Sequence, residues 1–115
     1  CNILHLHCKK VHFELAVRYR SFFQIVNWHD RETEPELKNA KISFSGTLLG
    51  GISQRTITFG NANDVLSEAI DAVSQTKGKK FILGTGCVVP VIAPYGNLRQ
   101  ASLSVRSKQT ADQEK

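Results

Sequence analysis

The stretch NANDVLSEAIDAVSQTKGKKFILG, residues 61–84, decides the fold class, because it joins a well-marked helix directly to a strand. Asn61 can cap the helix, and Asp64 stands at the capping-box position three residues later. One face of this helix then carries the apolar residues Val65, Ala69, Ile70 and Val73. Gly78 supplies the left-handed residue that ends many helices, and residues 80–83 form an apolar run of strand length.

Further apolar runs and helical patterns extend this alternation toward both ends of the chain. We expect strands over residues 3–7, 23–27 and 42–49, and helices over residues 11–19, 36–40 and 95–105. The resulting order, β-α-β-α-β-α-β-α, predicts an α/β fold with a parallel sheet covered by helices. Two architectures fit this order: a small open sheet, or four units of an eight-unit barrel of about 250 residues.

The folded unit is predicted to span residues 1–105. Residues 106–115 are polar and lack apolar periodicity, so we expect them to form a disordered tail. The chain begins at Cys1, contains no methionine and enters a strand-like run almost at once. We therefore expect a segment to be missing on the N-terminal side.

Charge and cysteine content narrow the expected partners and compartment. The formal net charge is +5, but Lys and Arg are scattered and not interleaved with aromatic residues, so we expect no nucleic-acid partner. We expect no membrane association, because no apolar run approaches the roughly 20 residues that span a bilayer. Three cysteines make an odd number with no secretory signal before them, which favours reduced thiols in a cytoplasm.

Polar and small residues follow each predicted strand, where a parallel α/β fold binds its ligands. They form four groups: His5-Leu6-His7-Cys8, Asn27-Trp28-His29-Asp30, Ser45-Gly46-Thr47 with Leu48 to Gly51, and Gly84-Thr85-Gly86-Cys87. Because the carboxyl ends of parallel strands meet at one edge of the sheet, we expect these groups to build a functional site.

His5, His7 and Cys87 are the candidate metal ligands. The two histidines stand two residues apart on a strand, so both point to the same side. Two imidazoles and a thiolate would give a three-ligand zinc site with an open fourth position. The alternative is that one histidine packs inside the fold and that Cys87 is a small buried apolar residue.

His29 and Asp30 are the candidate catalytic residues, with His29 as a proton carrier or donor and Asp30 as the group that orients it. The alternative is a solvated loop whose charges cap the next helix. Trp28 is expected to pack, or else to line a site for a flat aromatic ligand. The sequence contains no Gly-x-Ser-x-Gly elbow and no Ser-His-Asp set that spacing identifies.

Gly46, Thr47 and Gly86 are the candidate substrate contacts in the glycine-containing segments. Glycine allows a ligand to approach the backbone closely and exposes amide groups to an anion. The segment at residues 84–86 is not a P-loop, because no Lys-Ser/Thr pair follows it and the glycine spacing differs. Plain loop geometry is the alternative explanation for these glycines.

Three motifs resemble the uroporphyrinogen decarboxylase family: Ile-Val-Asn-Trp-His-Asp-Arg-Glu-Thr at residues 25–33, Gly-Thr-Leu-Leu-Gly-Gly-Ile at 46–52, and Phe-Ile-Leu-Gly-Thr-Gly-Cys-Val-Val-Pro at 81–90. The similarity extends over nearly the whole chain up to residue 105. The family fold is a (β/α)8 barrel, and these motifs belong to its C-terminal half. The resemblance therefore implies four β/α units of a TIM-type barrel, and that this chain is a fragment of it.

The resemblance implies one of two activities. The decarboxylase branch removes carboxylates from the four acetate side chains of uroporphyrinogen, in haem biosynthesis, without metal or organic cofactor. The other branch transfers methyl groups between corrinoid proteins and thiols, and it binds zinc through a His-x-Cys and a later Cys. His5 and Cys87 match zinc positions of that branch, whereas His7 stands where that branch has cysteine.

Decarboxylation of uroporphyrinogen is the first expectation, because it defines the family and requires no cofactor. Zinc-dependent methyl transfer to a thiol, with a corrinoid protein as partner, is the alternative within the same family. An inactive half barrel is the third, since its open sheet edges would need a second half or a second copy of the chain, as in a homodimer. The expected ligand is an anionic tetrapyrrole or another small molecule.

Overall fold

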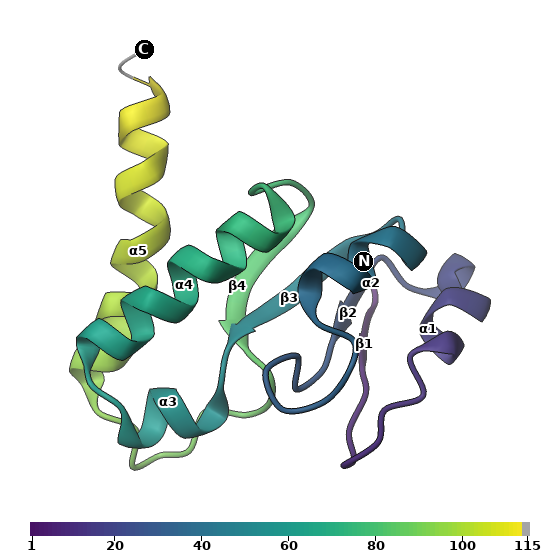
Figure 1. The fold of residues 1–115 in the computed structure, drawn as a ribbon, viewed down its shortest axis with the longest axis horizontal. Coiled ribbons are helices and arrows are strands. Elements are labelled where there is room, and N and C mark those ends of the chain that lie inside the picture. The colour runs from purple at the N-terminus through teal and green to yellow at the C-terminus, as the bar shows by residue number, and fades with distance from the viewer. Residues whose placement is uncertain (114–115) are drawn as a thin grey trace.

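The computed structural model describes residues 1–113 of the chain, and the side chains of residues 1–106. Four parallel strands form a sheet in the order β1-β2-β3-β4: β1 (Ile3–His5), β2 (Ile25–Asn27), β3 (Thr47–Ile52) and β4 (Phe81–Thr85). The helices are α1 (Glu14–Arg18), the 3-10 turn η1 (Arg20–Phe22), α2 (Leu37–Ser43), α3 (Gln54–Phe59), α4 (Ala62–Thr76) and α5 (Tyr95–Gln113) (Figure 1). The predicted α/β class, with a parallel sheet that alternates with helices, is confirmed.

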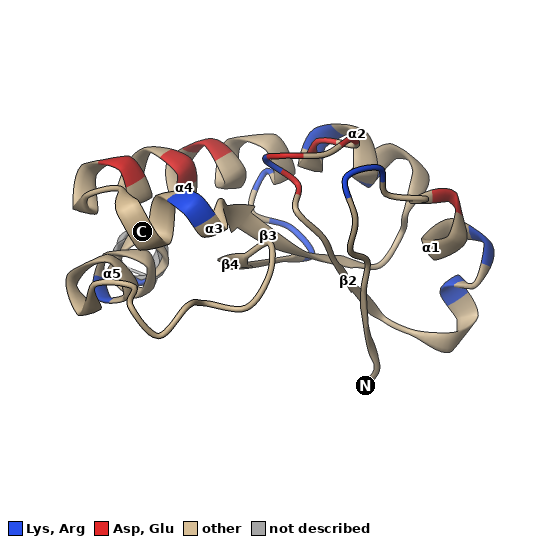
Figure 2. Cartoon of the chain, turned by 90° about the horizontal axis from the view of Figure 1, so that it is seen from below, with Lys and Arg blue, Asp and Glu red and all other residues tan. Residues whose placement is uncertain are grey.

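Helices α2 and α4 lie over one face of the sheet (Figure 2). Val26 of β2 and Leu48 of β3 are neighbours in the register, point to this face and are fully buried. On the opposite face, Ile3 and Ile82 remain 58% and 44% exposed. Ile25 and Asn27 of β2 share this face with Ile3 but are only 9% and 8% exposed, so within the described residues the sheet has one face packed by helices and one face that is exposed at its outer strands.

The main core fills the space between the packed face and the helices. Phe13 and Trp28 are in contact there, with ring centroids 4.8 Å apart. The buried members of this core are Phe13, Ala16, Phe23, Val26, Trp28, Leu37, Ala40, Phe44, Leu48 and Ala72. A smaller cluster of Ile52, Ile57 and Val65 joins β3, α3 and α4. Each large side chain buried in this way stabilises the fold by about 1.5–3 kcal/mol.

Helix α4 agrees with its prediction at its start, and of the predicted buried face Val65 and Ala69 are buried while Val73 is half-buried. The Asn61 side chain accepts a hydrogen bond from the Asp64 amide (3.0 Å), and the Asp64 carboxylate accepts one from the Asn61 amide (2.9 Å), which completes the predicted capping box. Gly78 has the expected positive φ of 65°. The predicted burial of Ile70 is wrong: this side chain is 54% exposed, because it lies about 100° around the helix from buried Ala69.

The predicted strand over residues 42–49 is wrong at both ends. Helix α2 continues to Ser43, and β3 begins only at Thr47 and runs to Ile52. Ile42 is 84% exposed on that helix. One exposed isoleucine close to the next strand gives the same local apolar signal as the strand itself, so periodicity misplaced the boundary.

Helix α3 is absent from the predicted elements. Ser53 marks its start, because its side chain accepts a hydrogen bond from the amide of Arg55 at 3.1 Å. The six residues that follow are too few to show a helical period.

Helix α5 continues to Gln113, beyond its predicted end at residue 105, so the predicted tail begins inside a helix. Residues 114–115 lie outside the described part of the chain, and disorder of the tail stays a prediction.

Among the described helices, none combines the length and the hydropathy that a membrane crossing requires. Lys and Arg are spread over several helices and loops (Figure 2).

Candidate metal centre at the carboxyl edge of the sheet

Three metal-ligating side chains meet beyond the carboxyl ends of the strands. His7 follows β1, His29 follows β2 and Cys87 follows β4. One ligand atom of each lies within 4.8 Å of the corresponding atoms of the other two. Residues that are far apart in the sequence thus form one cluster, called here the His-His-Cys cluster.

Strand pairing brings His7 to His29. The amide of Leu6 donates to the carbonyl of Asn27 at 2.9 Å, so β1 and β2 stay in contact beyond their last paired residues. The rings of His7 and His29 then meet edge to face, with centroids 5.4 Å apart. Cys8 turns the chain away immediately afterwards, with a φ of 135° that side-chain-bearing residues rarely adopt.

Gly86 brings Cys87 to the same point. A Cβ atom on Gly86 would lie only 2.8 Å from the Cα of His29 and 3.0 Å from the carbonyl oxygen of Trp28. The end of β4 can therefore approach the end of β2 only with glycine here. The Gly86 amide also donates to the carbonyl of Ile52 at 3.1 Å, which fixes the segment against β3.

Glu32 supplies the negative charge nearest to His29. Its Oε2 lies 3.6 Å from Nδ1 of His29, and its Oε1 accepts a hydrogen bond from the Ser53 hydroxyl at 3.2 Å. Thr33 donates its hydroxyl to the backbone carbonyl of His29 at 3.0 Å. The His29 side chain is only 10% exposed, so its ring is held in a defined position. A carboxylate at one ring nitrogen leaves the other nitrogen free to bind a metal.

His5 lies beside the cluster and not in it. Its Nδ1 is 2.7 Å from the Oδ1 of Asn27, and its ring centroid is 5.9 Å from that of His7. The structure thus groups His7 and Cys87 with His29 in place of the predicted ligand His5. The sequence already placed His29 after a strand, but spacing along the chain gave no measure of its distance from Cys87.

Asp30 does not serve as the partner of His29 that the sequence suggested. It turns to the helical face, where it is 5% exposed and accepts a hydrogen bond from the Gly51 amide at 2.9 Å. Burial raises the pKa of this carboxyl, and the Gly51 hydrogen bond and the nearby Arg31 only partly oppose that rise. Gly50 leaves room for this carboxylate, because a Cβ there would collide with it and force Asp30 to move.

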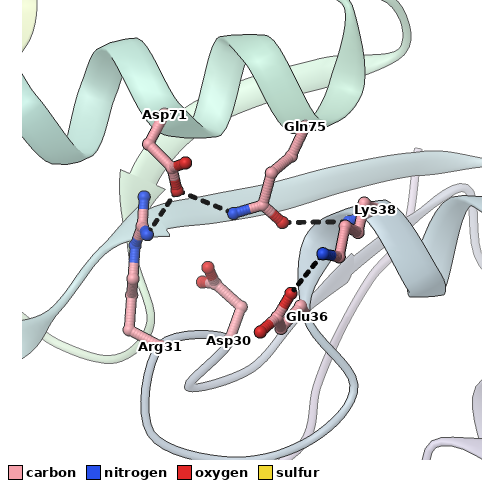
Figure 3. A pocket seen from close by; sticks show the side chains of 6 residues that line it. All are labelled: Asp30, Arg31, Glu36, Lys38, Asp71 and Gln75. Carbon is pink, nitrogen blue, oxygen red and sulfur yellow. Dashed lines mark hydrogen bonds and ion pairs between the residues drawn. The ribbon is translucent and has the colours of Figure 1, made fainter.

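Arg31 connects the segment after β2 to β3 and α4. Its guanidinium donates to the carbonyl of Gly51 (2.8 Å), the carbonyl of Glu68 (2.7 Å) and the carboxylate of Asp71 (2.6 Å). Arg31 and Asp71 line a polar cavity of about 250 Å³ together with Asp30, Glu36, Lys38 and Gln75 (Figure 3). This network holds the loop that begins with His29.

The remaining predicted site residues lie away from the cluster or in the core. Trp28 is fully buried, and its Nε1 donates to the carbonyl of Pro35 at 3.0 Å. Gly46 and Thr47 stand at the start of β3, the opposite end from the cluster, because that strand begins later than predicted. Their roles as substrate contacts, like those of Trp28 and Gly86, stay predictions.

Two hollows open beside the cluster. One has a volume of about 540 Å³ and is lined by His7, Cys8, Lys9, His29, Glu32, Thr33 and Gln54. The other has a volume of about 460 Å³ and is lined by His5, Asn27, Leu49, Thr85, Cys87 and Val88. Ligands therefore have access to both sides of the cluster.

The fold and the site define an α/β protein with a candidate His-His-Cys metal centre at the carboxyl edge of its sheet. Comparisons with protein-family models, curated proteins and solved structures give no match to this chain.

Proposed function

We propose that this chain is part of a zinc enzyme of the uroporphyrinogen decarboxylase family that activates a thiol for methyl transfer, with His7, His29 and Cys87 as metal ligands. The observation that carries the proposal is the convergence of two imidazoles and one thiol within 4.8 Å at the carboxyl edge of the sheet. This edge is where parallel α/β folds carry their active sites.

The donor set suits zinc. Zinc binds imidazole nitrogen at about 2.0–2.1 Å and thiolate sulfur at about 2.3 Å, so its tetrahedral ligands stand roughly 3.3–3.6 Å apart. The ligand atoms of the cluster lie up to 4.8 Å apart, and small side-chain rotations would bring them to the spacing of zinc ligands. His7 is exposed while His29 and Cys87 are half-buried, so one side of the cluster is open to solvent. Catalytic zinc sites keep an open position of this kind for water or substrate.

The residues of the chain have separate parts in this chemistry. When bound, zinc supplies positive charge that lowers the pKa of a substrate thiol, so that the thiol reacts as a thiolate at neutral pH. The Glu32 carboxylate lies 3.6 Å from Nδ1 of His29, and Gly86 lets Cys87 approach the end of β2. A thiol held beside the cluster would form the new sulfur–carbon bond with its own electron pair, and a methyl donor of the corrinoid class would keep the electrons of the bond that breaks.

A complete barrel is the architecture that we propose for the active protein. Its support is a four-stranded parallel sheet with helices over one face and exposed isoleucines, Ile3 and Ile82, on the other. In a closed barrel the inner face is filled by side chains, and β1 and β4 are paired by further strands. We therefore propose activity for the completed barrel, and an inactive state for this half barrel alone.

Decarboxylation of an anionic tetrapyrrole is the second candidate, in the cytoplasm and without a cofactor. It is favoured by Lys9 in the hollow that His7, His29 and Glu32 also line, since an ammonium group binds carboxylates. This reading needs the same residues as substrate contacts and no metal.

Two assays on the complete protein separate the candidates. The zinc-loaded protein should convert a thiol to its methyl thioether with methylcobalamin as donor, and a chelator should abolish this activity. Uroporphyrinogen should be left unchanged. Stepwise decarboxylation of uroporphyrinogen by metal-free protein would contradict the proposal and support the second candidate.

A further inference from the structure

A hollow of about 300 Å³ lies at the amino ends of β2, β3 and β4, at the opposite end of these strands from the His-His-Cys cluster. Hydrogen bonds between the strand starts fix its shape. The Thr47 amide donates to the carbonyl of Gln24, and the Leu48 amide donates to the carbonyl of Lys80, both at 3.0 Å. Ligand pockets have volumes of roughly 300–1,000 Å³, so this hollow suits a small ligand.

Gly46 lets the segment before β3 lie close to the buried floor of the hollow. A Cβ atom on Gly46 would lie 2.6 Å from Cε1 of Phe44 and 2.7 Å from the carbonyl oxygen of Gln24. The rings of Phe44 and Phe23 are stacked, with centroids 6.0 Å apart, and both side chains are buried. The backbone of residues 45–46 therefore runs over a packed aromatic pair.

Several hydrogen-bond donors at the hollow have no acceptor in the protein. Within the described residues, no hydrogen bond is donated by the backbone amides of Ser45 and Gly46 or by the hydroxyls of Ser45 and Thr47. The Oε1 of Gln24 accepts a hydrogen bond from the Asn2 amide at 2.8 Å, which leaves its Nε2 as a further donor. A ligand that offers acceptors would complement this lining.

Lys80 places a positive charge at the hollow. Its ammonium donates to the carbonyl of Ser45 at 3.0 Å, so it is held at the segment before β3 and keeps its other hydrogens for a ligand. Arg20 also lines the hollow, whereas no Asp or Glu does. Over the part of the chain that the structure describes, neither Lys80 nor Arg20 forms an ion pair with a carboxylate. The protein therefore leaves the positive charge here unbalanced.

The polar cavity in Figure 3 shows the opposite arrangement. Its cations are paired with carboxylates, Arg31 with Asp71 at 2.6 Å and Lys38 with Glu36 at 3.4 Å. Charge is thus balanced within that cavity, but at the amino ends of the strands it has to be balanced by an anion from solution.

We propose that the hollow at the amino ends of β2, β3 and β4 binds a phosphate group, either as free phosphate or as part of a phosphate monoester. The ammonium of Lys80 supplies the charge, and the amides of Ser45 and Gly46 donate to the phosphate oxygens. A phosphate group carries up to two negative charges and three strong acceptor oxygens, which suits donors that come from three separate segments of the chain. The site lies away from the metal cluster and does not depend on the proposed function.

A titration of the wild-type chain tests the site. ¹H–¹⁵N correlation spectra of the labelled full chain are recorded with sodium phosphate, and with sodium chloride at equal ionic strength. We expect phosphate to shift the amide signals of Ser45 and Gly46 to saturation, and chloride to leave them in place. No saturable shift, or the same shift with chloride, would overturn the proposal.

Two lysine variants separate a site from general electrostatics. Lys80→Gln should weaken phosphate binding roughly 10-fold, because it removes a charge-assisted hydrogen bond. Lys79→Gln removes the same charge from the preceding residue, which does not line the hollow, and should change the affinity little because exposed charges are screened by salt. Equal losses in the two variants would overturn the proposal.

Three anions of different chemistry test the ligand class. Glycerol 3-phosphate and inorganic phosphate should both shift the signals of Ser45 and Gly46. Tighter binding of the ester identifies the ligand as a phosphate monoester, and tighter binding of the inorganic ion identifies it as free phosphate. Acetate at equal ionic strength should bind more weakly than either, and equal affinity for acetate would overturn the assignment to phosphate.

Discussion

His29 and Asp30 are neighbours in the sequence, but their side chains belong to two different polar regions. The regions differ in whether their polar groups are paired with one another. Around Asp30, the side chains pair with one another and with the backbone: the carboxylate accepts from Gly51, and Arg31 ties the loop to α4. Around His29, three metal-ligating atoms converge at the open edge of the sheet. The chain turns at this point, where the Asp30 amide donates to the carbonyl of Trp28 and the Thr33 amide donates to the carbonyl of His29, so one loop serves both regions.

The two regions differ in what their side chains do, because one stabilises the fold and the other can bind a ligand. Paired polar groups in the Asp30 region hold the loop on the helices, so their loss should reduce the free energy of unfolding. Convergent ligand atoms in the His-His-Cys cluster contribute little to the fold, so their loss should reduce metal affinity.

The largest effect is expected for Cys87→Ser on zinc affinity. Removal of the one thiolate ligand should lower the affinity by more than the roughly 10–100-fold that loss of an outer-shell group costs. Competition with a chromogenic chelator measures this change. Cys8→Ser is the matched control, because Cys8 borders the adjacent hollow but does not belong to the cluster. Equal losses in both variants would contradict the proposed ligand set.

Arg31→Ala should give the largest loss of stability in the Asp30 region. Charge-assisted hydrogen bonds to half-buried carbonyls are worth about 1.5–3 kcal/mol each, whereas the exposed ion pair with Asp71 adds little. We expect a loss of about 2–3 kcal/mol in urea unfolding, with Arg31→Lys in between because lysine lacks the planar fork. An unchanged midpoint would show that the network does not hold the loop.

Glu32→Gln should weaken zinc binding while leaving the fold intact. Its carboxylate lies 3.6 Å from Nδ1 of His29, and outer carboxylates of this kind contribute roughly 10–100-fold to metal affinity. Glu34→Gln removes the same charge from the same loop and serves as the control. A chelator competition assay measures both variants. If Glu32→Gln and Glu34→Gln lowered the zinc affinity equally, Glu32 would act only through its charge and not through its position beside His29.

Asp30→Asn should change how stability depends on pH. Burial raises the pKa of Asp30 above its ordinary value of 3.8, so the folded protein holds this proton more tightly than the unfolded chain. The protonated carboxyl makes its full contribution to the free energy of unfolding below pH 3.8. This contribution is lost as the pH rises through the folded-state pKa. Asparagine still accepts from Gly51 but cannot ionise. The variant should therefore gain stability relative to wild type across that range, by about 1.4 kcal/mol per unit of pKa elevation.

Denaturant unfolding at a series of pH values measures this difference. A constant difference between Asp30→Asn and wild type would show that the folded-state pKa of Asp30 is not raised.

The smallest effect is expected for Ile42→Lys. Ile42 is 84% exposed on α2, so the substitution should change the free energy of unfolding by less than about 0.5 kcal/mol. Leu37→Ala on the same helix should cost about 2–5 kcal/mol, because Leu37 is fully buried. If Ile42→Lys and Leu37→Ala reduced the free energy of unfolding by similar amounts, Ile42 would be buried, as the predicted strand requires.

The fold was predictable from the sequence where local signals and tertiary packing agree. The capping box of Asn61 and Asp64 is a local interaction, and its residue types identify it before any packing is known. The boundary near Ile42 was not predictable in this way, because an exposed isoleucine on a helix and the first residue of a strand look alike in periodicity.

The sequence predicted where the candidate site lies, but not which residues form it. Parallel strands bring their carboxyl ends together, which placed His7, His29 and Cys87 at one edge before any distance was known. The choice between His5 and His29 depends on where Asn27 holds the His5 ring and on how closely Gly86 approaches His29. Both are contacts between strands, and spacing along one strand does not encode them.

The zinc affinities of wild type, His29→Ala and His5→Ala show which histidines bind the metal. We expect one zinc per chain in wild type and in His5→Ala, and loss of tight binding in His29→Ala, because the cluster consists of His7, His29 and Cys87. Loss of binding in His5→Ala with retention in His29→Ala would contradict the account and restore His5, His7 and Cys87 as the ligands.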